Sequence, residues 1–113
     1  MPTQHTTLSL LIAARQLIAD PANWTTKVYA RAKDDTSRIP TERTACKFCA
    51  LGAVHHAMGH VSYEGTTRSV TDALHLSARK MGAANVPELN DKQGHGRVLA
   101  MFDSAICSLE GTV

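Results

Sequence analysis

The chain has 113 residues, of which 43% are hydrophobic and 19% are charged, so it is expected to form one globular domain and not a disordered or collagen-like chain. Twelve Lys and Arg against ten Asp and Glu leave a net charge of +2, too small to favour a protein built to bind phosphate or an anionic membrane. Aromatic residues make up 4%, too few for a base-stacking platform. No long apolar run predicts a membrane span and no N-terminal pattern predicts secretion, so we expect a cytoplasmic protein.

The N-terminal part is predicted to contain one helix followed by an irregular insertion. Thr6 or Thr7 can cap the helix, its apolar residues recur with the helical period, and Asp20-Pro21 ends it because the residue before proline disfavours helical backbone. Residues 1–5 are expected to be flexible. Residues 24–43 show no helical periodicity. Their residue types favour an extended segment, then a turn and then a return strand, which predicts a small hairpin.

Helical periodicity predicts three further helices, at about residues 44–58, 67–81 and 95–110. The last of these has the clearest apolar stripe, which places Phe102 in the core together with Leu17 of the first helix. Residues 83–94 are expected to be a polar connection. The sequence therefore predicts a mainly α fold: a compact single domain, residues 1–113, of about four helices with a small β-hairpin-like insertion after the first helix.

Several short motifs occur in a fixed order along the chain. They are Asp20-Pro21-x-x-Trp24, Tyr29-Ala30-Arg31, Cys49-x-Leu51-Gly52-Ala53, Leu89-Asn90-Asp91 and Val98-Leu99-x-x-x-Asp103-x-Ala105-Ile106. The pattern covers nearly the whole chain and resembles a family of small uncharacterised proteins, a domain of unknown function from phages and actinobacteria. Members often have a glycine shortly after the first Trp, where this chain has Lys27. The resemblance implies a shared fold and a phage-associated setting, and it implies no particular reaction.

A Cys-x-x-Cys pair followed by histidines makes residues 46–60 a candidate zinc site. On one helix, Cys46 and Cys49 would share a face with their Cβ atoms about 5–6 Å apart. His56 and His60 form a second pair, but about 10.5 Å of helix would separate Cys49 from His56, too far for one ion. The simpler interpretation is that both cysteines are reduced core residues. We therefore expect no cofactor, and zinc bound by these four residues remains the alternative.

A second group of polar and aromatic residues lies in the two irregular segments: Trp24, Tyr29, Arg31, Arg38, Asn90 and Asp91. If the segments meet, these residues form a binding surface or pocket with an aromatic wall. The competing interpretation is structural. Asn90 or Asp91 would cap the last helix, and Arg31 would pair with Asp91 to hold the insertion in place.

No arrangement of residues in the sequence predicts catalysis. The leading hypothesis is a small non-enzymatic interaction protein, a phage accessory factor that binds a host or phage protein in the host-cell cytoplasm through a surface including residues 24–43. The alternatives are a zinc module and a small ligand-binding protein or enzyme that uses a pocket of Trp24, Arg31 and Asp91. The low net charge argues against nucleic acid as the partner, no membrane partner is expected, and homo-oligomerisation stays open.

Overall fold

The computed structural model describes residues 3–58 and 64–110, with side chains described at 7–58 and 68–109. Within these ranges the helices are α1 (Thr3–Leu17), α2 (Ala50–Met58), α3 (Glu64–Lys80), α4 (Val86–Gln93) and α5 (His95–Glu110). A 3-10 turn, η1 (Pro21–Asn23), and three short strands, β1 (Ala30–Arg31), β2 (Ser37–Arg38) and β3 (Lys47–Phe48), lie between α1 and α2. The predicted mainly helical domain with a small β insertion is therefore confirmed. No helix in the described ranges is long and apolar enough to cross a bilayer.

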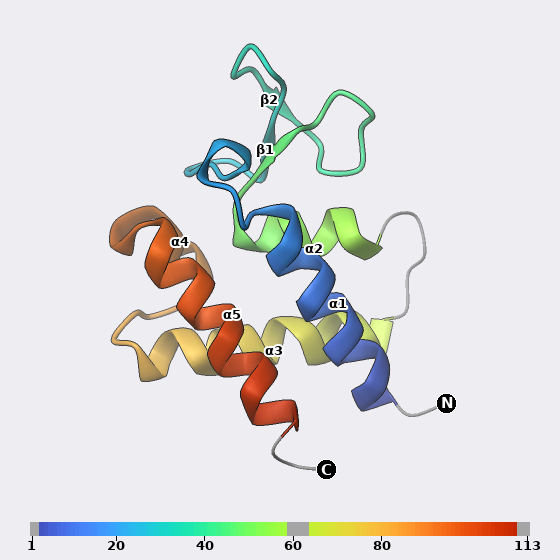
Figure 1. Cartoon of the computed structure of the whole chain (residues 1–113), viewed down its shortest axis with the longest axis vertical. Helices are drawn as coiled ribbons and strands as arrows, with labels where there is room; N and C mark the ends of the chain where they lie inside the picture. Colours follow the sequence, from blue (N-terminus) through green and yellow to red (C-terminus); the bar gives the residue numbers. More distant parts are fainter. Residues whose placement is uncertain (1–2, 59–63, 111–113) are drawn as a thin grey trace.

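The five helices pack around one apolar core. Helix α1 contacts α2, α3 and α5, and α5 also contacts α3 and α4 (Figure 1). Phe102 is fully buried, as predicted, whereas Leu17 is half-buried at the margin of the core. The largest other side chains with no exposure include Leu11, Ile18, Leu74, Leu89 and Met101.

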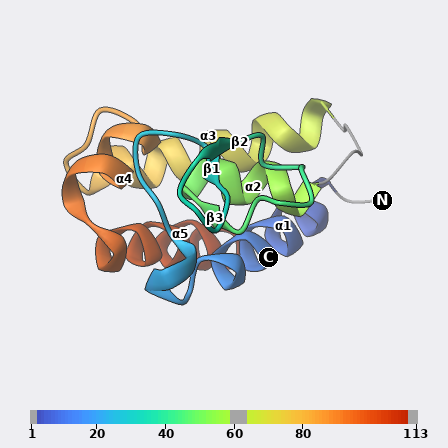
Figure 2. The same ribbon diagram turned by 90° about the horizontal axis from the view of Figure 1, so that it is seen from above.

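The strands form a small antiparallel sheet in the order β2-β1-β3. Ala30 pairs with Arg38 on one side and with Phe48 on the other. We call residues 24–48 the extension, because the sheet and its loops stand above the helices (Figures 1 and 2). The predicted hairpin is present, but the strands are shorter than expected, and residues 24–29 contribute only an isolated parallel bridge between Trp24 and Phe48.

Helix α1 begins at Thr3, before the predicted caps at Thr6 and Thr7 and within the segment for which we expected flexibility. It ends at Leu17, ahead of the predicted stop at Asp20. Asp20 caps η1 instead, where its Oδ1 accepts a hydrogen bond of 2.9 Å from the Ala22 amide. The proline is thus in the first turn of η1, where its missing N–H is tolerated.

The prediction that a helix begins near residue 44 is wrong. Helix α2 begins at Ala50, and the preceding residues pair with the extension. The Cys46 amide donates to the Arg31 carbonyl at 3.0 Å, and the Cys49 amide donates to the Tyr29 carbonyl at 3.1 Å. These bonds to distant residues satisfy the backbone groups that a longer helix would have satisfied locally.

Residues 83–94 contain helix α4, so the prediction of a polar connection is also wrong. Asn85 caps this helix, because its Oδ1 accepts from the Glu88 amide at 2.9 Å and Glu88 Oε1 accepts from the Ala84 amide at 2.9 Å. Pro87 lies in the first turn, where proline favours helix initiation. Helix α5 has the predicted bounds, and α3 extends from Glu64 to Lys80.

Candidate functional site

Asn90 holds the extension, α2 and α4 together. Its side chain is 1% exposed, and its Oδ1 accepts hydrogen bonds from Trp24 Nε1 at 2.8 Å and from the Ala50 amide at 3.0 Å. Its Nδ2 donates to the Thr25 carbonyl at 3.1 Å and to Asp91 Oδ1 at 3.0 Å. All four hydrogen-bonding positions of the carboxamide are therefore used. The structural interpretation expected Asn90 to cap the last helix. This is wrong, because Asn90 lies inside α4.

Asp91 fixes the neighbouring loop. Its Oδ1 accepts a hydrogen bond of 2.9 Å from the Lys27 amide. Lys27 has a φ angle of 72°, in the left-handed region that favours glycine. The two irregular segments thus meet, which is the condition on which the predicted pocket depended, through Trp24 with Asn90 and Lys27 with Asp91.

The predicted pairing of Arg31 with Asp91 is wrong. Arg31 Nε donates to Thr25 Oγ1 at 2.8 Å, and its two terminal nitrogens donate to the Asp35 carbonyl at 2.8 Å and the Thr26 carbonyl at 3.3 Å. The guanidinium therefore braces the extension internally. Arg38 also bonds within the extension. Its Nε donates a hydrogen bond of 3.1 Å to Thr44 Oγ1 and lies 3.9 Å from Glu42 Oε2.

Gly52 allows the extension to approach α2. A Cβ atom at this position would lie 1.9 Å from the carbonyl oxygen of Tyr29, so only glycine fits without a shift of the backbone. Cys49 precedes the helix, and its Sγ accepts a hydrogen bond of 3.3 Å from the Gly52 amide. The sequence did not predict this role of Gly52. The motif that contains Gly52 does not indicate that a carbonyl group lies against it.

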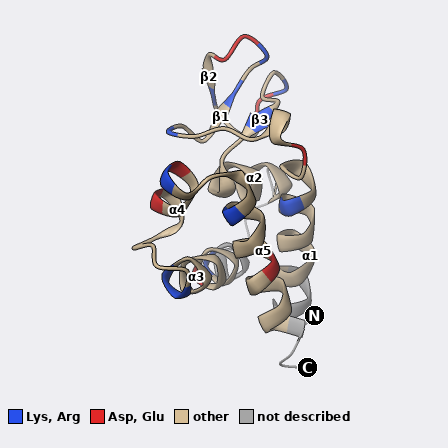
Figure 3. Cartoon of the chain, turned by 60° about the vertical axis from the view of Figure 1, so that its left-hand side comes forward, with Lys and Arg blue, Asp and Glu red and all other residues tan. Residues whose placement is uncertain are grey.

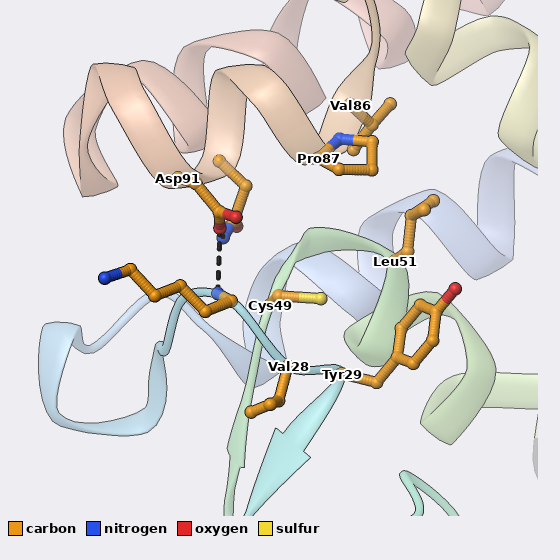
Figure 4. A pocket seen from close by; sticks show the side chains of 9 residues that line it. Val28, Tyr29, Cys49, Leu51, Val86, Pro87 and Asp91 are labelled. Atoms are coloured by element: carbon orange, nitrogen blue, oxygen red, sulfur yellow. Dashed lines mark hydrogen bonds between the residues drawn. The ribbon is translucent and has the colours of Figure 1, made fainter.

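A pocket of about 250 Å³ lies where these segments meet (Figure 4). Its lining residues come from the extension, the start of α2 and one face of α4: Lys27, Val28, Tyr29, Cys49, Leu51, Val86, Pro87, Asn90 and Asp91. Of the predicted pocket residues, Tyr29, Asn90 and Asp91 line it. Trp24 instead contacts His95, with ring centroids 5.5 Å apart, and Arg31 and Arg38 do not line this pocket.

The Cys49 thiol is half-buried in this pocket, and its pKa is raised. Burial is the main cause that raises its pKa above the usual value, and the negative charge of Asp91 acts in the same direction. Hydrogen bonds from the Gly52 and Leu51 amides oppose the shift. A thiol in this state is a poor nucleophile at neutral pH.

The metal candidates are distributed differently from the prediction. Cys46 is exposed and Cys49 is half-buried, and the two flank β3 and do not share a helical face. His56 Nδ1 lies 2.8 Å from the Pro40 carbonyl oxygen, and its ring contacts Phe48. His60 lies outside the described residues. Among the described residues, no group of three or more His, Cys, Asp or Glu side chains is arranged to hold a metal ion.

Comparison with known proteins gives one match. Neither the curated proteins nor the solved structures contain a match to this chain. A family model described as a family of unknown function, DUF6197, matches residues 2–107, nearly the whole chain. The chain therefore belongs to this family, DUF6197.

Proposed function

We propose that the protein is a small non-enzymatic interaction protein that binds another protein through the extension. The observation that carries this proposal is the concentration of positive charge on residues 24–48, a segment that also presents two exposed apolar side chains. The extension contains the predicted surface, residues 24–43, together with the strand that completes the sheet.

Charge supports the assignment of this surface. The extension holds six of the twelve Lys and Arg residues and three of the ten Asp and Glu residues, a net charge of +3, whereas the remainder of the chain carries −1. Figure 3 shows charged residues along the strands and loops of the extension. A basic surface on a nearly neutral protein favours a partner with an acidic surface, because complementary potentials steer the two together.

Two large apolar side chains on the extension are exposed. Tyr29 is 54% exposed and Ile39 is 63% exposed. Lys33 and Arg43 are also exposed and lie in the loops of the same segment. Aromatic residues and arginine are enriched at protein interfaces, where they supply much of the binding energy. Because Arg31 and Arg38 bond within the extension, we expect these four side chains to make more of the partner contacts than the two arginines do.

The setting that we propose follows from the resemblance noted in the sequence. A phage accessory factor would act on a host or phage protein in the host-cell cytoplasm. The zinc alternative loses support because Cys46 and Cys49 are separated by a strand, and no described group of residues suggests catalysis.

Affinity capture followed by direct binding measurement tests the proposal. The wild-type protein and the double variant Lys33→Glu/Arg43→Glu are used to capture proteins from a lysate of the host, and captured proteins are identified and purified for calorimetry. We expect the charge reversal to weaken binding at least about tenfold, because it removes complementary charge from the contact surface. The matched control Arg79→Glu/Lys80→Glu, at the end of α3, should bind as the wild type does. Equal loss in both double variants, or no loss in either, would place the interface elsewhere, and capture of nucleic acid alone would exclude a protein partner.

A further inference from the structure

The pocket at the base of the extension has the size and walls of a small-molecule site. Val28, Leu51, Val86, Pro87 and the Tyr29 ring supply apolar surface from three separate parts of the chain. Its volume of about 250 Å³ exceeds the cavity of about 150 Å³ that accepts one benzene molecule. The pocket can therefore hold a single six-membered ring with a short substituent.

One end of the pocket carries a carboxylate that is only partly satisfied. Asp91 Oδ1 accepts from the Lys27 amide and from Asn90 Nδ2. Among the described residues, no donor is bonded to Asp91 Oδ2 and no cation forms an ion pair with Asp91; the ion pairs there involve Asp103, Glu42 and Asp35. A carboxylate oxygen at the end of an apolar pocket favours a ligand with a charged donor, because charge-assisted hydrogen bonds are about twice as strong as neutral ones.

The walls of the pocket are held in position before any ligand binds. Asn90, on α4, bonds to the other two segments that form the pocket, and the close approach of Gly52 fixes the backbone of Tyr29. The Lys27 backbone is held in its left-handed conformation by the bond to Asp91. A ligand would therefore cause little loss of conformational entropy in the protein when it binds.

We propose that this pocket binds a small organic amine that carries one apolar ring. The ring packs against Leu51, Val86 and Pro87, and the ammonium group donates to Asp91 Oδ2. This ligand site shares the Tyr29 side chain with the proposed interaction surface but does not depend on that surface, and the family description assigns it no ligand. Figure 4 shows Cys49 Sγ, Leu51, Pro87 and Asp91 around the space that the ring would occupy.

Three probes with the same ring and different charge test the proposal: benzylamine, benzyl alcohol and benzoate. Each is titrated into the full chain while the Lys27 amide and the Asn90 carboxamide signals are followed by NMR. We expect benzylamine to shift both signals and to bind at least about tenfold more tightly than benzyl alcohol, and benzoate to bind most weakly, because the charge of Asp91 attracts only the first. Bound benzylamine should also cover Cys49 and slow its alkylation, while the exposed Cys46 and Cys107 react unchanged.

The variant Asp91→Asn removes the charge and keeps an oxygen that can accept from the Lys27 amide. We expect it to reduce benzylamine binding to the level of benzyl alcohol, whereas the control Asp72→Asn, at an exposed position on α3, leaves binding unchanged. Equal binding of the three probes, tighter binding of benzoate, or signal shifts confined to residues outside the pocket would overturn the proposal. The comparison of probes on the wild-type protein decides it even if Asp91→Asn does not fold. Absence of amine binding would leave the test of the extension with its own partner unaffected.

Discussion

The indole Nε1 of Trp24 donates a hydrogen bond of 2.8 Å to the carboxamide oxygen of Asn90, 66 positions later in the chain. This bond joins the start of the extension to helix α4. The same oxygen accepts a hydrogen bond from the backbone amide of Ala50, the first residue of α2. One side chain thus satisfies donors from both the extension and α2.

The variant Asn90→Ala should destabilise the fold by at least about 3 kcal/mol. It leaves the Trp24 indole N–H, the Ala50 amide and the Thr25 carbonyl without their partner, and each such group costs about 1–3 kcal/mol when buried. Urea unfolding followed by circular dichroism measures the loss. The control Asn23→Ala, at an exposed position in η1, should change stability by less than about 0.5 kcal/mol. A loss below about 1 kcal/mol for Asn90→Ala would show that water replaces these bonds without cost.

Replacing Gly52 by Ala should destabilise the protein by about 2 kcal/mol or more, because the added Cβ would overlap the Tyr29 carbonyl oxygen and displace the extension. Gly96, in the first turn of α5, is the matched control: no atom lies within 4 Å of its added Cβ, so Gly96→Ala should stabilise by about 0.5–1 kcal/mol through helix propensity. Thermal unfolding of the two variants should therefore give shifts of opposite sign. Shifts of the same sign would contradict the close contact.

Cys49 should react much more slowly with a thiol reagent than Cys46 and Cys107 in the folded protein. Cys49 is half-buried with a raised pKa, whereas the other two thiols are exposed. Alkylation with iodoacetamide near neutral pH, resolved by peptide mass spectrometry, should modify two sites quickly and the third slowly. Unfolding in urea is the control, because all three should then react at similar rates. Rapid alkylation of Cys49 in the native protein would show that the pocket is open at the thiol.

The same pKa shift predicts how stability changes with pH. Since the folded protein holds the Cys49 proton more tightly than the unfolded chain, this contribution is present below the usual pKa and is lost as the pH rises through the raised value. The variant Cys49→Ser keeps an acceptor for the Gly52 amide and removes the titration. The wild type should therefore lose more stability than this variant between neutral and alkaline pH. Parallel curves for the two proteins would contradict the shift.

The sequence predicted the helices whose apolar stripes are long and regular, and α5 has the bounds that periodicity gave. It failed where tertiary hydrogen bonds decide the backbone. The amides of Cys46 and Cys49 bond to carbonyls of the extension, and these distant partners replace the helical pattern that the local residues favour. Helix α4 was missed because residues 83–94 were interpreted as a polar connection, although Pro87 in the first turn after an Asn cap is a start signal.

The candidate site was predicted in outline only. The meeting of the two irregular segments could be anticipated because both carry polar side chains that need partners. The hydrogen-bond partners of these side chains could not be anticipated from the sequence. Arg31 has Asp91 as an obvious counter-charge in the sequence, yet three acceptors within its own segment satisfy it. The contact of Gly52 with Tyr29 depends on the distance between two backbones, for which no sequence pattern exists.

The variant Arg31→Ala should loosen the extension without unfolding the helices. Arg31 links Thr25, Thr26 and Asp35, so its loss removes three hydrogen bonds that lie wholly within residues 25–35, while the core around Phe102 is untouched. Local opening then becomes more frequent than global unfolding, and we expect amide exchange at Ala32 and Cys46, which bond to the Thr36 and Arg31 carbonyls, to accelerate at least about tenfold.

Global stability in the same Arg31→Ala variant should fall by only about 1 kcal/mol, because the guanidinium is half-buried and water can replace part of what it supplies. The conservative variant Arg31→Lys should not restore slow exchange, since a single ammonium cannot reach three acceptors that the planar guanidinium reaches together. Arg43→Ala, exposed on a neighbouring loop, is the control and should leave exchange as in the wild type. If the amides of Arg31→Ala and Arg43→Ala exchange at the same rates, the hydrogen bonds of Arg31 contribute nothing to the order of the extension. Arg31 would then be available to contact a partner.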